Sequence, residues 1–441
     1  MSELADRLGG TPYESYLYAY PHKTAYRALA PRVPIARAWR EERRDALFLY
    51  VHVPFCEMRC GFCNLFTTAR PKDDLVEAYL GALERQCRVV AGALGEASFA
   101  RFALGGGTPT LLPAPALARL LDLAERVMGA DLARVPCSVE TSPETATPER
   151  LRVLRERGID RVSLGVQSFV ASETAAVHRP QRADDVQRAL ELLVGLGFPT
   201  LNIDLMYGLP GQTLDSWQRS LEAALAWRPA ELYLYPLYVR PLTTLGRRAR
   251  DPAAEDPRLP LYRLARERLA DAGYTQDSMR MFRAPGAPSQ DGPVYCVQED
   301  GMVGLGCGAR SYTSRLHYAS EYAVGARGVR EILDGWIARD DDAFTHADWG
   351  FELDGEEQRR RFVAMSLLVA DGLDLEAYRR RFGAEAVDDL PGLLQLEPAG
   401  LATVRDRRVR LTAAGLERSD TLGPWLHSER VRALMDSSEL R

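Results

Sequence analysis

Short apolar runs alternate with longer amphipathic segments from residue 47 onward. Each apolar run is bounded by Gly, Pro or polar residues, as is typical of a strand that is buried on both faces. The predicted strands are Leu47–Val53, Phe99–Leu104, Pro136–Glu140, Arg161–Val166, Leu201–Met206 and Glu231–Leu237.

The segments between these runs have the periodicity of amphipathic helices. The predicted helices are Asp73–Leu94, Ala114–Met128, Pro148–Arg157, Ala183–Leu196 and Leu214–Ala226. Strands that alternate with helices indicate parallel βαβ units. Polar and Gly-rich residues follow the strands directly, which is where barrel-like α/β enzymes place their sites. The pattern therefore predicts an α/β fold with a site at the carboxyl ends of its strands.

A different pattern begins near residue 354 and predicts a small, winged-helix-like C-terminal domain. Its predicted elements are two helices, Glu356–Leu368 and Leu375–Phe382, and a short hairpin within the runs Leu393–Leu396, Leu401–Val404 and Val409–Leu411, with a turn at Arg405–Arg408. We divide the chain into an aromatic-rich N-terminal extension (1–45), a core (46–240), a less regular extension (241–353) and this C-terminal domain (354–441).

Composition narrows the class of protein. The 441 residues are 46% hydrophobic and 27% charged, as in soluble globular proteins. No stretch approaches the ~20 apolar residues of a membrane span, and the N-terminus MSELADRLGG lacks the layout of a signal peptide. The net charge of −5 gives no support for nucleic-acid binding. We therefore expect a cytoplasmic protein that acts on neither membranes nor nucleic acids.

Three of the seven cysteines lie together after the first predicted strand. Cys56, Cys60 and Cys63, in HVPFCEMRCGFCN, have the spacing C-x3-C-x2-C. Structural zinc and ordinary iron–sulfur clusters take four protein ligands. Three thiolates on one loop therefore suggest a [4Fe–4S] cluster with one iron left open for a small molecule. An incomplete zinc site and scattered core cysteines are the alternatives.

Each later strand also supplies a candidate for chemistry. Gly105–Thr110 (GGGTPT) follows the second strand, and we expect it to expose N–H donors to a ligand, with a simple turn as the alternative. Glu140 follows the third strand, where it could accept hydrogen bonds from a ribose diol, hold a cation or be a solvated loop acid. The fourth strand is followed by Gln167 and Arg179, and the fifth strand contains Asp204. Polar groups in apolar runs need partners, so their joint appearance indicates a site.

The segments YVHVPFCEMRCGFCNLFT, GGGTPT, GVQSF and NIDLMYGLPGQT resemble the oxygen-independent coproporphyrinogen III oxidase (HemN-like) family of radical S-adenosylmethionine (SAM) proteins. The similarity is close over residues 47 to about 240 and looser beyond, as in a divergent paralogue. It implies an open, partial (β/α)6 TIM-like barrel and a [4Fe–4S] cluster on Cys56, Cys60 and Cys63. It also implies contacts with SAM from Tyr50, Phe62, Gly106, Gly107, Thr108, Glu140, Gln167, Arg179 and Asp204.

The resemblance further implies radical chemistry. A flavodoxin- or ferredoxin-type protein would supply one electron, and cleavage of SAM would give a 5′-deoxyadenosyl radical that abstracts hydrogen from an organic substrate. One SAM binds, or two, and a second SAM would allow methyl or methylene transfer. Oxidative decarboxylation of coproporphyrinogen III, a step of porphyrin biosynthesis, is the alternative enzyme activity. A non-catalytic haem chaperone is the alternative of another class.

The chain departs from these relatives in two segments. The stretch before GLGCGARSY has neither the His-Asn pair nor the Trp of haem-handling relatives, and Arg310 stands where they usually have His. This counts against haem binding through that segment. The N-terminal run LYAYPHKTAYRAL contains Tyr18, Lys23 and Tyr26, and we expect it either to cap the substrate or to pack on the barrel as an aromatic strap.

The remaining cysteines and His52 carry weaker signals. We expect Cys87 and Cys137 to lie in the core. Cys296 and Cys307 are expected to be partly buried thiols, with an auxiliary cluster as the alternative. His52 precedes the cysteine loop, where we expect it to pack against the loop or support it.

Overall fold

The computed structural model describes residues 3–247, 256–288 and 295–439. A 13-stranded sheet has the strand order β1-β15-β14-β13-β12-β2-β5-β6-β7-β8-β9-β11-β10. Its centre consists of consecutive parallel strands: β2 (Leu47–Val53), β5 (Phe99–Gly106), β6 (Cys137–Thr141), β7 (Arg161–Gln167), β8 (Thr200–Tyr207) and β9 (Glu231–Pro236). These strands confirm the six predicted ones to within two residues at each end.

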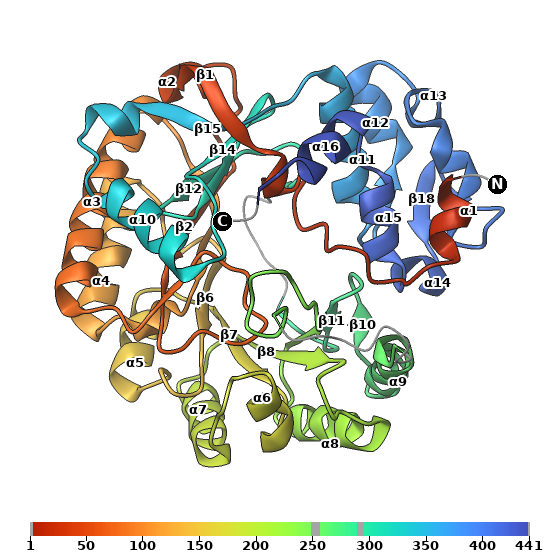
Figure 1. Ribbon diagram of the computed structural model, residues 1–441, viewed down its shortest axis with the longest axis horizontal. Coiled ribbons are helices and arrows are strands. Elements are labelled where there is room, and N and C mark those ends of the chain that lie inside the picture. Colours follow the sequence, from red (N-terminus) through yellow and green to blue (C-terminus); the bar gives the residue numbers. More distant parts are fainter. Residues whose placement is uncertain (1–2, 248–255, 289–294, 440–441) are drawn as a thin grey trace.

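Helices follow the parallel strands and lie on the outer side of the curved sheet (Figure 1). They are α3 (Asp73–Leu94), α4 (Ala114–Asp122), α5 (Pro148–Glu156), α7 (Ala183–Gly195) and α8 (Leu214–Leu225). The predicted helix over 114–128 continues past α4 as a π-helical turn, Leu123–Val127. Strand side chains such as Phe102, Leu164 and Ile203 are fully buried in the main hydrophobic core. Burial on both faces explains why these strands are apolar throughout.

Segments distant in the chain extend the sheet at both edges. Beside β2 lie β12 (Met302–Leu305), β13 (Arg310–Tyr312), β14 (Leu316–Ala319), β15 (His346–Glu352) and β1 (Arg27–Pro34). Beyond β9 lie β11 (Met281–Arg283) and β10 (Thr275–Gln276), which follow α9 (Arg258–Asp271). The helix α10 (Ala326–Ile337) connects β14 to β15. The N-terminal extension is therefore not irregular throughout, because β1 pairs antiparallel with β15.

The C-terminal region has its own hydrophobic cluster. Its helices are α11 (Gly355–Leu367), α12 (Leu375–Phe382), α13 (Ala386–Asp389), α14 (Ala413–Leu416), α15 (Ser419–Trp425) and α16 (Glu429–Asp436). A three-stranded sheet has the order β16 (Leu373–Asp374), β18 (Arg408–Leu411), β17 (Ala402–Arg405).

The predicted hairpin is formed by β17 and β18, and the run Leu393–Leu396 lies outside it. Pro391–Gln395 forms a 3-10 helix. Leu393 and Leu396 are buried while Leu394 is 64% exposed. Burial at positions three apart matches the three residues per turn of a 3-10 helix, and the short run LLQL alone does not distinguish such a helix from a strand.

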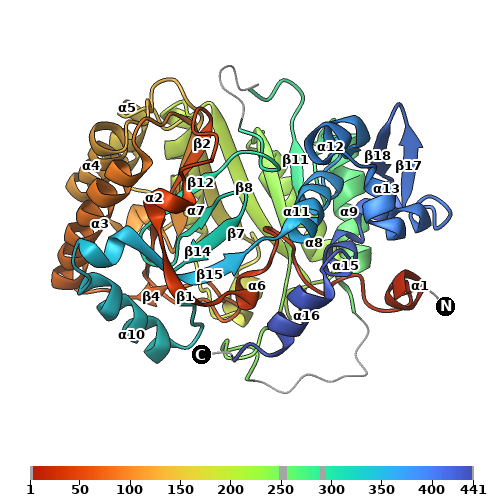
Figure 2. The ribbon, with the colours of Figure 1, turned by 90° about the horizontal axis from the view of Figure 1, so that it is seen from above.

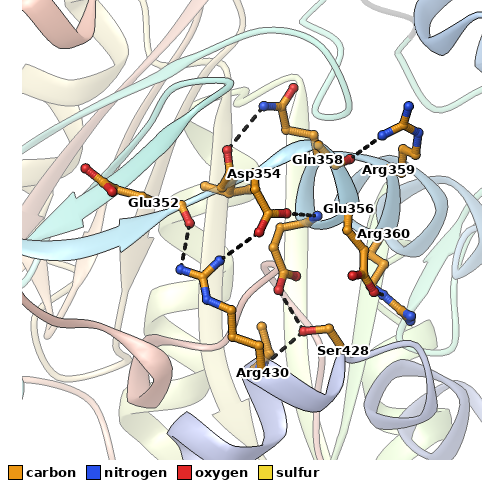
Figure 3. Close-up of polar contacts among 12 residues, drawn as sticks. Glu352, Asp354, Glu356, Gln358, Arg359, Arg360, Ser428 and Arg430 are labelled. Carbon is orange, nitrogen blue, oxygen red and sulfur yellow. Dashed lines mark hydrogen bonds and ion pairs between the residues drawn. The ribbon is translucent and has the colours of Figure 1, made fainter.

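The first turns of α11 and α16 are tied together by polar side chains (Figure 3). Asp354 accepts a hydrogen bond from the Glu357 backbone N–H at 3.0 Å and is bridged by Arg430 at 3.2 Å. Ser428 accepts from the Val431 N–H at 3.0 Å and donates to the Glu357 carboxylate at 2.7 Å. The residue that caps each helix therefore also binds a side chain of the other helix, and this holds the two N-termini together.

The segment after α1 (Glu3–Leu8) runs from the C-terminal region back to the sheet (Figures 1 and 2). Leu4, Leu17, Tyr20 and Tyr26 belong to the hydrophobic cluster of the C-terminal region. The Tyr20 hydroxyl donates to the Glu357 carboxylate. Tyr18 and Ala19 pack with Met302 and Tyr312 of the sheet. The strap therefore packs on the barrel, as one of the two predictions had it, and also on the C-terminal region. Among the helices that the structure describes, none offers the long apolar stretch that crossing a membrane requires.

Candidate active site

All of the predicted cluster ligands and SAM contacts line one cavity of about 980 Å³. Its floor is formed at the carboxyl ends of the parallel strands. The residues concerned are Tyr50, Cys56, Cys60, Phe62, Cys63, Gly106, Gly107, Thr108, Glu140, Gln167, Arg179 and Asp204. The structure thus brings together every position selected from the sequence, although these positions come from five different strands and the loops after them.

The cysteine loop is closed by two short strands. β3 (Phe55–Cys56) pairs with β4 (Thr68–Ala69), so the residues between them form a tight loop at the end of β2. The Gly61 N–H donates to the Val177 carbonyl at 2.8 Å, which anchors the middle of the loop. The thiols of Cys56, Cys60 and Cys63 are free and half-buried.

These thiols fit an iron–sulfur cluster better than a single ion. Burial raises the pKa of the Cys56 thiol to about 12 and also raises that of Cys63, so the thiolates need a bound cation. No group of three or more His, Cys, Asp or Glu side chains within the described ranges could hold one metal ion. A cubane cluster does not require thiols to meet at one point, because each cysteine binds a different iron atom. The donor set therefore fits a [4Fe–4S] cluster.

The glycine-rich loop packs directly against the cysteine loop. The Gly107 N–H donates to the Val53 carbonyl at 2.8 Å, and the Thr108 N–H donates to the Phe55 carbonyl at 2.7 Å. A Cβ atom on Gly107 would lie 2.4 Å from the Phe55 oxygen, so only glycine fits there. The Gly106 N–H is also used, since it donates to Glu140 Oε2 at 3.0 Å.

The expectation that this loop exposes free N–H donors is therefore wrong. The N–H groups of Gly106, Gly107 and Thr108 all have partners, because the loop continues the pairing of β5 with the chain that leads into the cysteines. These three N–H groups are therefore not free to bind a ligand. Carbonyl oxygens are acceptors and suit an ammonium group.

Two carboxylates lie on neighbouring parts of the floor. Glu140 is open to the cavity but surrounded by its walls, and this burial together with the charge of Asp204 raises the Glu140 pKa to about 7. Burial also raises the pKa of Asp204, although hydrogen bonds from Asn202 at 2.7 Å and Ser163 at 3.1 Å oppose the shift. The pKa of Glu140 thus lies near neutral pH, and the carboxylate of Asp204 is held by two hydrogen-bond donors. Both side chains can act as acceptors for a polar ligand.

Gln167 and Arg179 are positioned by an irregularity in β7. The register of β7 against β8 shifts between Gly165 and Gln167, and Gln167 has a φ of 67°. This left-handed backbone conformation is uncommon for a residue other than glycine and is typical of functional sites. Arg179 donates to the Gly165 carbonyl at 2.7 Å and to the Cys60 sulfur at 3.3 Å. The site therefore links two of the predicted SAM contacts to a predicted cluster ligand.

Several residues of the site were not selected from the sequence. Gln181 also lines the cavity and donates to the carbonyls of Val166 and Ser168 at 2.9 and 2.8 Å. Its position two residues after Arg179, in HRPQ, was the available signal. Ser163 and Asn202 hold Asp204 and could have been found as polar residues inside strands.

The structure also shows where His52 and the four remaining cysteines lie. His52 bonds with the Phe66 carbonyl at 3.0 Å and the Tyr50 hydroxyl at 3.2 Å, which agrees with support of the cysteine loop. Cys87 and Cys137 are fully buried in the core, as expected. Cys307 is buried and Cys296 half-buried, and neither is among the residues that line the cavity.

The aromatic strap forms one wall of the same cavity. Tyr16, Tyr18, His22, Lys23 and Tyr26 line it. The segment thus lines the cavity as well as packing on its neighbours, and a role in capping the substrate stays a prediction.

Comparisons with known proteins agree with the resemblance seen in the sequence. The Radical SAM superfamily matches residues 50–224, and the HemN C-terminal domain matches residues 353–417. The heme chaperone HemW of Bacillus subtilis is 28% identical over 393 residues, which cover 86% of this chain and 98% of HemW. The oxygen-independent coproporphyrinogen III oxidase of Paracoccus denitrificans is 33% identical over 345 residues, which cover 73% of this chain and 74% of the oxidase.

A solved structure shares the fold. The coproporphyrinogen III oxidase HemN of Escherichia coli matches 97% of this chain and 100% of its own length, with a TM-score of 0.76 and 22% identity. The mixed α/β architecture and the additional C-terminal domain are thus common to both. With three clustered cysteines at the mouth of a parallel sheet and these relatives, the chain belongs to the HemN-like family of radical SAM proteins.

Proposed function

We propose that the protein is an enzyme that cleaves SAM at a [4Fe–4S] cluster held by Cys56, Cys60 and Cys63. When bound, such a cluster would supply one electron for cleavage of the C5′–S bond of SAM, which would release methionine and a 5′-deoxyadenosyl radical able to abstract hydrogen from an organic substrate. One observation carries the proposal: the three thiols share a cavity with Glu140, Gln167, Arg179 and Asp204, which the parallel strands and the loops after them present at their carboxyl ends.

The chain's own residues would orient SAM. The glycine-rich loop would accept hydrogen bonds from the methionine amino group, since the N–H groups of Gly106 and Gly107 already have partners and an ammonium group needs acceptors. Glu140 is placed to accept from the ribose hydroxyls, and Asp204 offers a second carboxylate. Tyr50 and Phe62 supply apolar surface, and Gln167 with Arg179 completes the polar side.

The remaining walls would exclude water from a reactive radical. Tyr16, Tyr18 and Tyr26 cover the side that the parallel strands leave open. A volume of about 980 Å³ lies near the upper end of the ~300–1,000 Å³ typical of small-molecule sites. This supports a substrate, or a second SAM for methyl or methylene transfer, beside the first SAM.

The proposal includes an electron donor and a compartment. The cluster needs one electron per turnover, which a flavodoxin- or ferredoxin-type protein would supply. All seven cysteines are free, which agrees with a reducing cytoplasm.

A haem chaperone is the second candidate. It is favoured by the match to a heme chaperone over 98% of that relative's length. A histidine ligand for haem would have to come from the cavity wall, where His22 and His52 lie. Because His52 already bonds with Phe66 and Tyr50, His22 is the better candidate for that role.

An anaerobic assay tests the proposal. The reconstituted protein is mixed with dithionite and SAM, and 5′-deoxyadenosine is measured. We expect its release, and absence of release together with tight haem retention would favour the chaperone. Adding coproporphyrinogen III tests the oxidase alternative, since loss of carbon dioxide would identify that substrate and its absence would remove it.

A further inference from the structure

Basic side chains gather on the cavity wall that the strap and the antiparallel strands form. Lys23 lies on the strap, Arg310 begins β13, and both line the cavity with Arg240. The Lys23 Nζ is 3.6 Å from the centre of the Tyr322 ring, and the Arg310 guanidinium carbon is 4.5 Å from that of Tyr18. These cations therefore rest on aromatic faces.

Neither Lys23 nor Arg310 has an acidic partner in the parts of the chain that the structure describes. The Nη1 atom of Arg310 is buried and makes no hydrogen bond. Burial lowers the pKa of Lys23 well below its ordinary value, the charges of Arg310 and Arg240 lower it further, and the negative charge of the Cys63 thiolate opposes the shift. The acids of the floor are engaged elsewhere: Glu140 accepts from Gly106, and Asp204 from Asn202 and Ser163.

Two cations that face a cavity without an acidic side chain beside them cost free energy unless a ligand supplies the negative charge. Removing a charge from water costs several kcal/mol when nothing pairs with it. A carboxylate would restore that pairing, and a guanidinium can bind its two oxygens at once. The rings of Tyr18, Tyr312 and Tyr322 suit a flat, apolar body attached to such a carboxylate.

We propose that Lys23 and Arg310 bind a carboxylate of the organic substrate, which lies against the tyrosines of this wall. The inference rests on the proposed function for the identity of the site. Both side chains lie on the wall formed by the strap and the antiparallel strands, away from the carboxylates of the floor. The two residues would therefore contribute to the choice of substrate.

A binding measurement without SAM turnover tests the inference. The probe is coproporphyrin III, an aromatic tetracarboxylate, and its matched control is the neutral tetraamide of the same ring. Both are titrated by fluorescence into the anaerobic, cluster-loaded protein. We expect K23Q and R310Q each to weaken binding of the acid by about 10- to 100-fold, the value of a charge-assisted hydrogen bond.

The same titrations contain the controls. R315Q removes a surface cation paired with Glu41 and should bind the acid as the unaltered chain does. K23R keeps the charge and should recover most of the affinity. Failure of the unaltered chain to bind the acid, equal binding of acid and amide, or an affinity of K23Q or R310Q for the acid equal to that of the unaltered chain would each overturn the inference.

A second titration separates the substrate from SAM. Equilibrium dialysis of SAM against K23Q and R310Q should give dissociation constants within about threefold of the unaltered chain. Weaker binding of SAM with unchanged binding of coproporphyrin III would assign these cations to SAM or the cluster, and would overturn the inference. Because neither titration needs SAM cleavage, a failed 5′-deoxyadenosine assay would not be mistaken for failure of the carboxylate site.

Discussion

The Nη1 atom of Arg179 lies 3.3 Å from the Cys60 sulfur and donates a hydrogen bond to it. The other terminal nitrogen of the same guanidinium holds the Gly165 carbonyl at 2.7 Å. One side chain thus connects the cysteine loop to the irregular part of β7. Hydrogen bonds to cluster sulfurs tune the reduction potential of the cluster.

Replacing Arg179 by Gln should lower the reduction potential of the cluster. Without the cationic donor, the negative charge added on reduction is less stabilised. We also expect SAM cleavage to slow about 10- to 100-fold, as for other residues that support metal ligands. A redox titration followed by electron paramagnetic resonance (EPR) gives the potential. R182Q, which alters a side chain that is 78% exposed, is the control, and an R179Q potential equal to that of R182Q would contradict the role given to Arg179.

Replacing Gly107 by Ala should prevent cluster assembly. Its Cβ would lie 2.4 Å from the Phe55 oxygen, so the chain that leads into Cys56 would have to move. We expect iron content after reconstitution to fall several-fold. The matched control is G92A in α3, where an added Cβ meets no atom within 4 Å and should stabilise the helix by up to about 1 kcal/mol. Full iron loading of G107A would show that the two loops need not pack this closely.

SAM affinity should weaken as the pH falls from about 8 to about 6. The pKa of Glu140 in the ligand-free chain is raised to about 7, and a ligand that donates to the carboxylate favours its ionised form. Below that pKa each pH unit should cost up to about tenfold in affinity, because a proton must leave for SAM to bind. E140Q cannot ionise and should bind SAM weakly with little pH dependence. A pH profile of E140Q that parallels the unaltered chain would assign the dependence to another group.

The ion pair of Arg280 and Asp420 should contribute strongly to stability. The two side chains are 4% and 1% exposed and approach to 2.5 Å, and they join the sheet edge to α15. D420A leaves a buried guanidinium unpaired, so we expect the free energy of unfolding at pH 7 to fall by about 3–5 kcal/mol. R330Q, which removes an exposed pair with Asp334, should change it by less than about 1 kcal/mol. Denaturant unfolding gives both values, and similar losses in the two variants would refute the distinction.

The sequence predicted the parallel core well because its signals are local. Strands buried on both faces are apolar from end to end, so Leu47–Val53 and Asp73–Leu94 match β2 and α3 residue for residue. Because the carboxyl ends of parallel strands meet at one edge, polar residues after successive strands could be expected to converge.

Other features depend on contacts that a local pattern does not contain. The pairing of β1 with β15 joins segments from opposite ends of the chain. The hydrogen bond from the Gly107 N–H to the Val53 carbonyl depends on how the glycine-rich loop packs against the cysteine loop. The approach of Lys23 to Arg310 likewise follows from the fold, since each was noted from the sequence only as a departure from relatives.

The central claim is that three cysteines hold a [4Fe–4S] cluster whose open iron binds SAM. EPR spectra of the dithionite-reduced, reconstituted protein, recorded with and without SAM, test it most directly. The account predicts about four iron atoms per chain, a reduced-cluster signal that SAM changes, and loss of both iron and signal in C60A but not in C87A. A signal that SAM leaves unchanged, or a C60A variant that keeps both the cluster and the response to SAM, would contradict it.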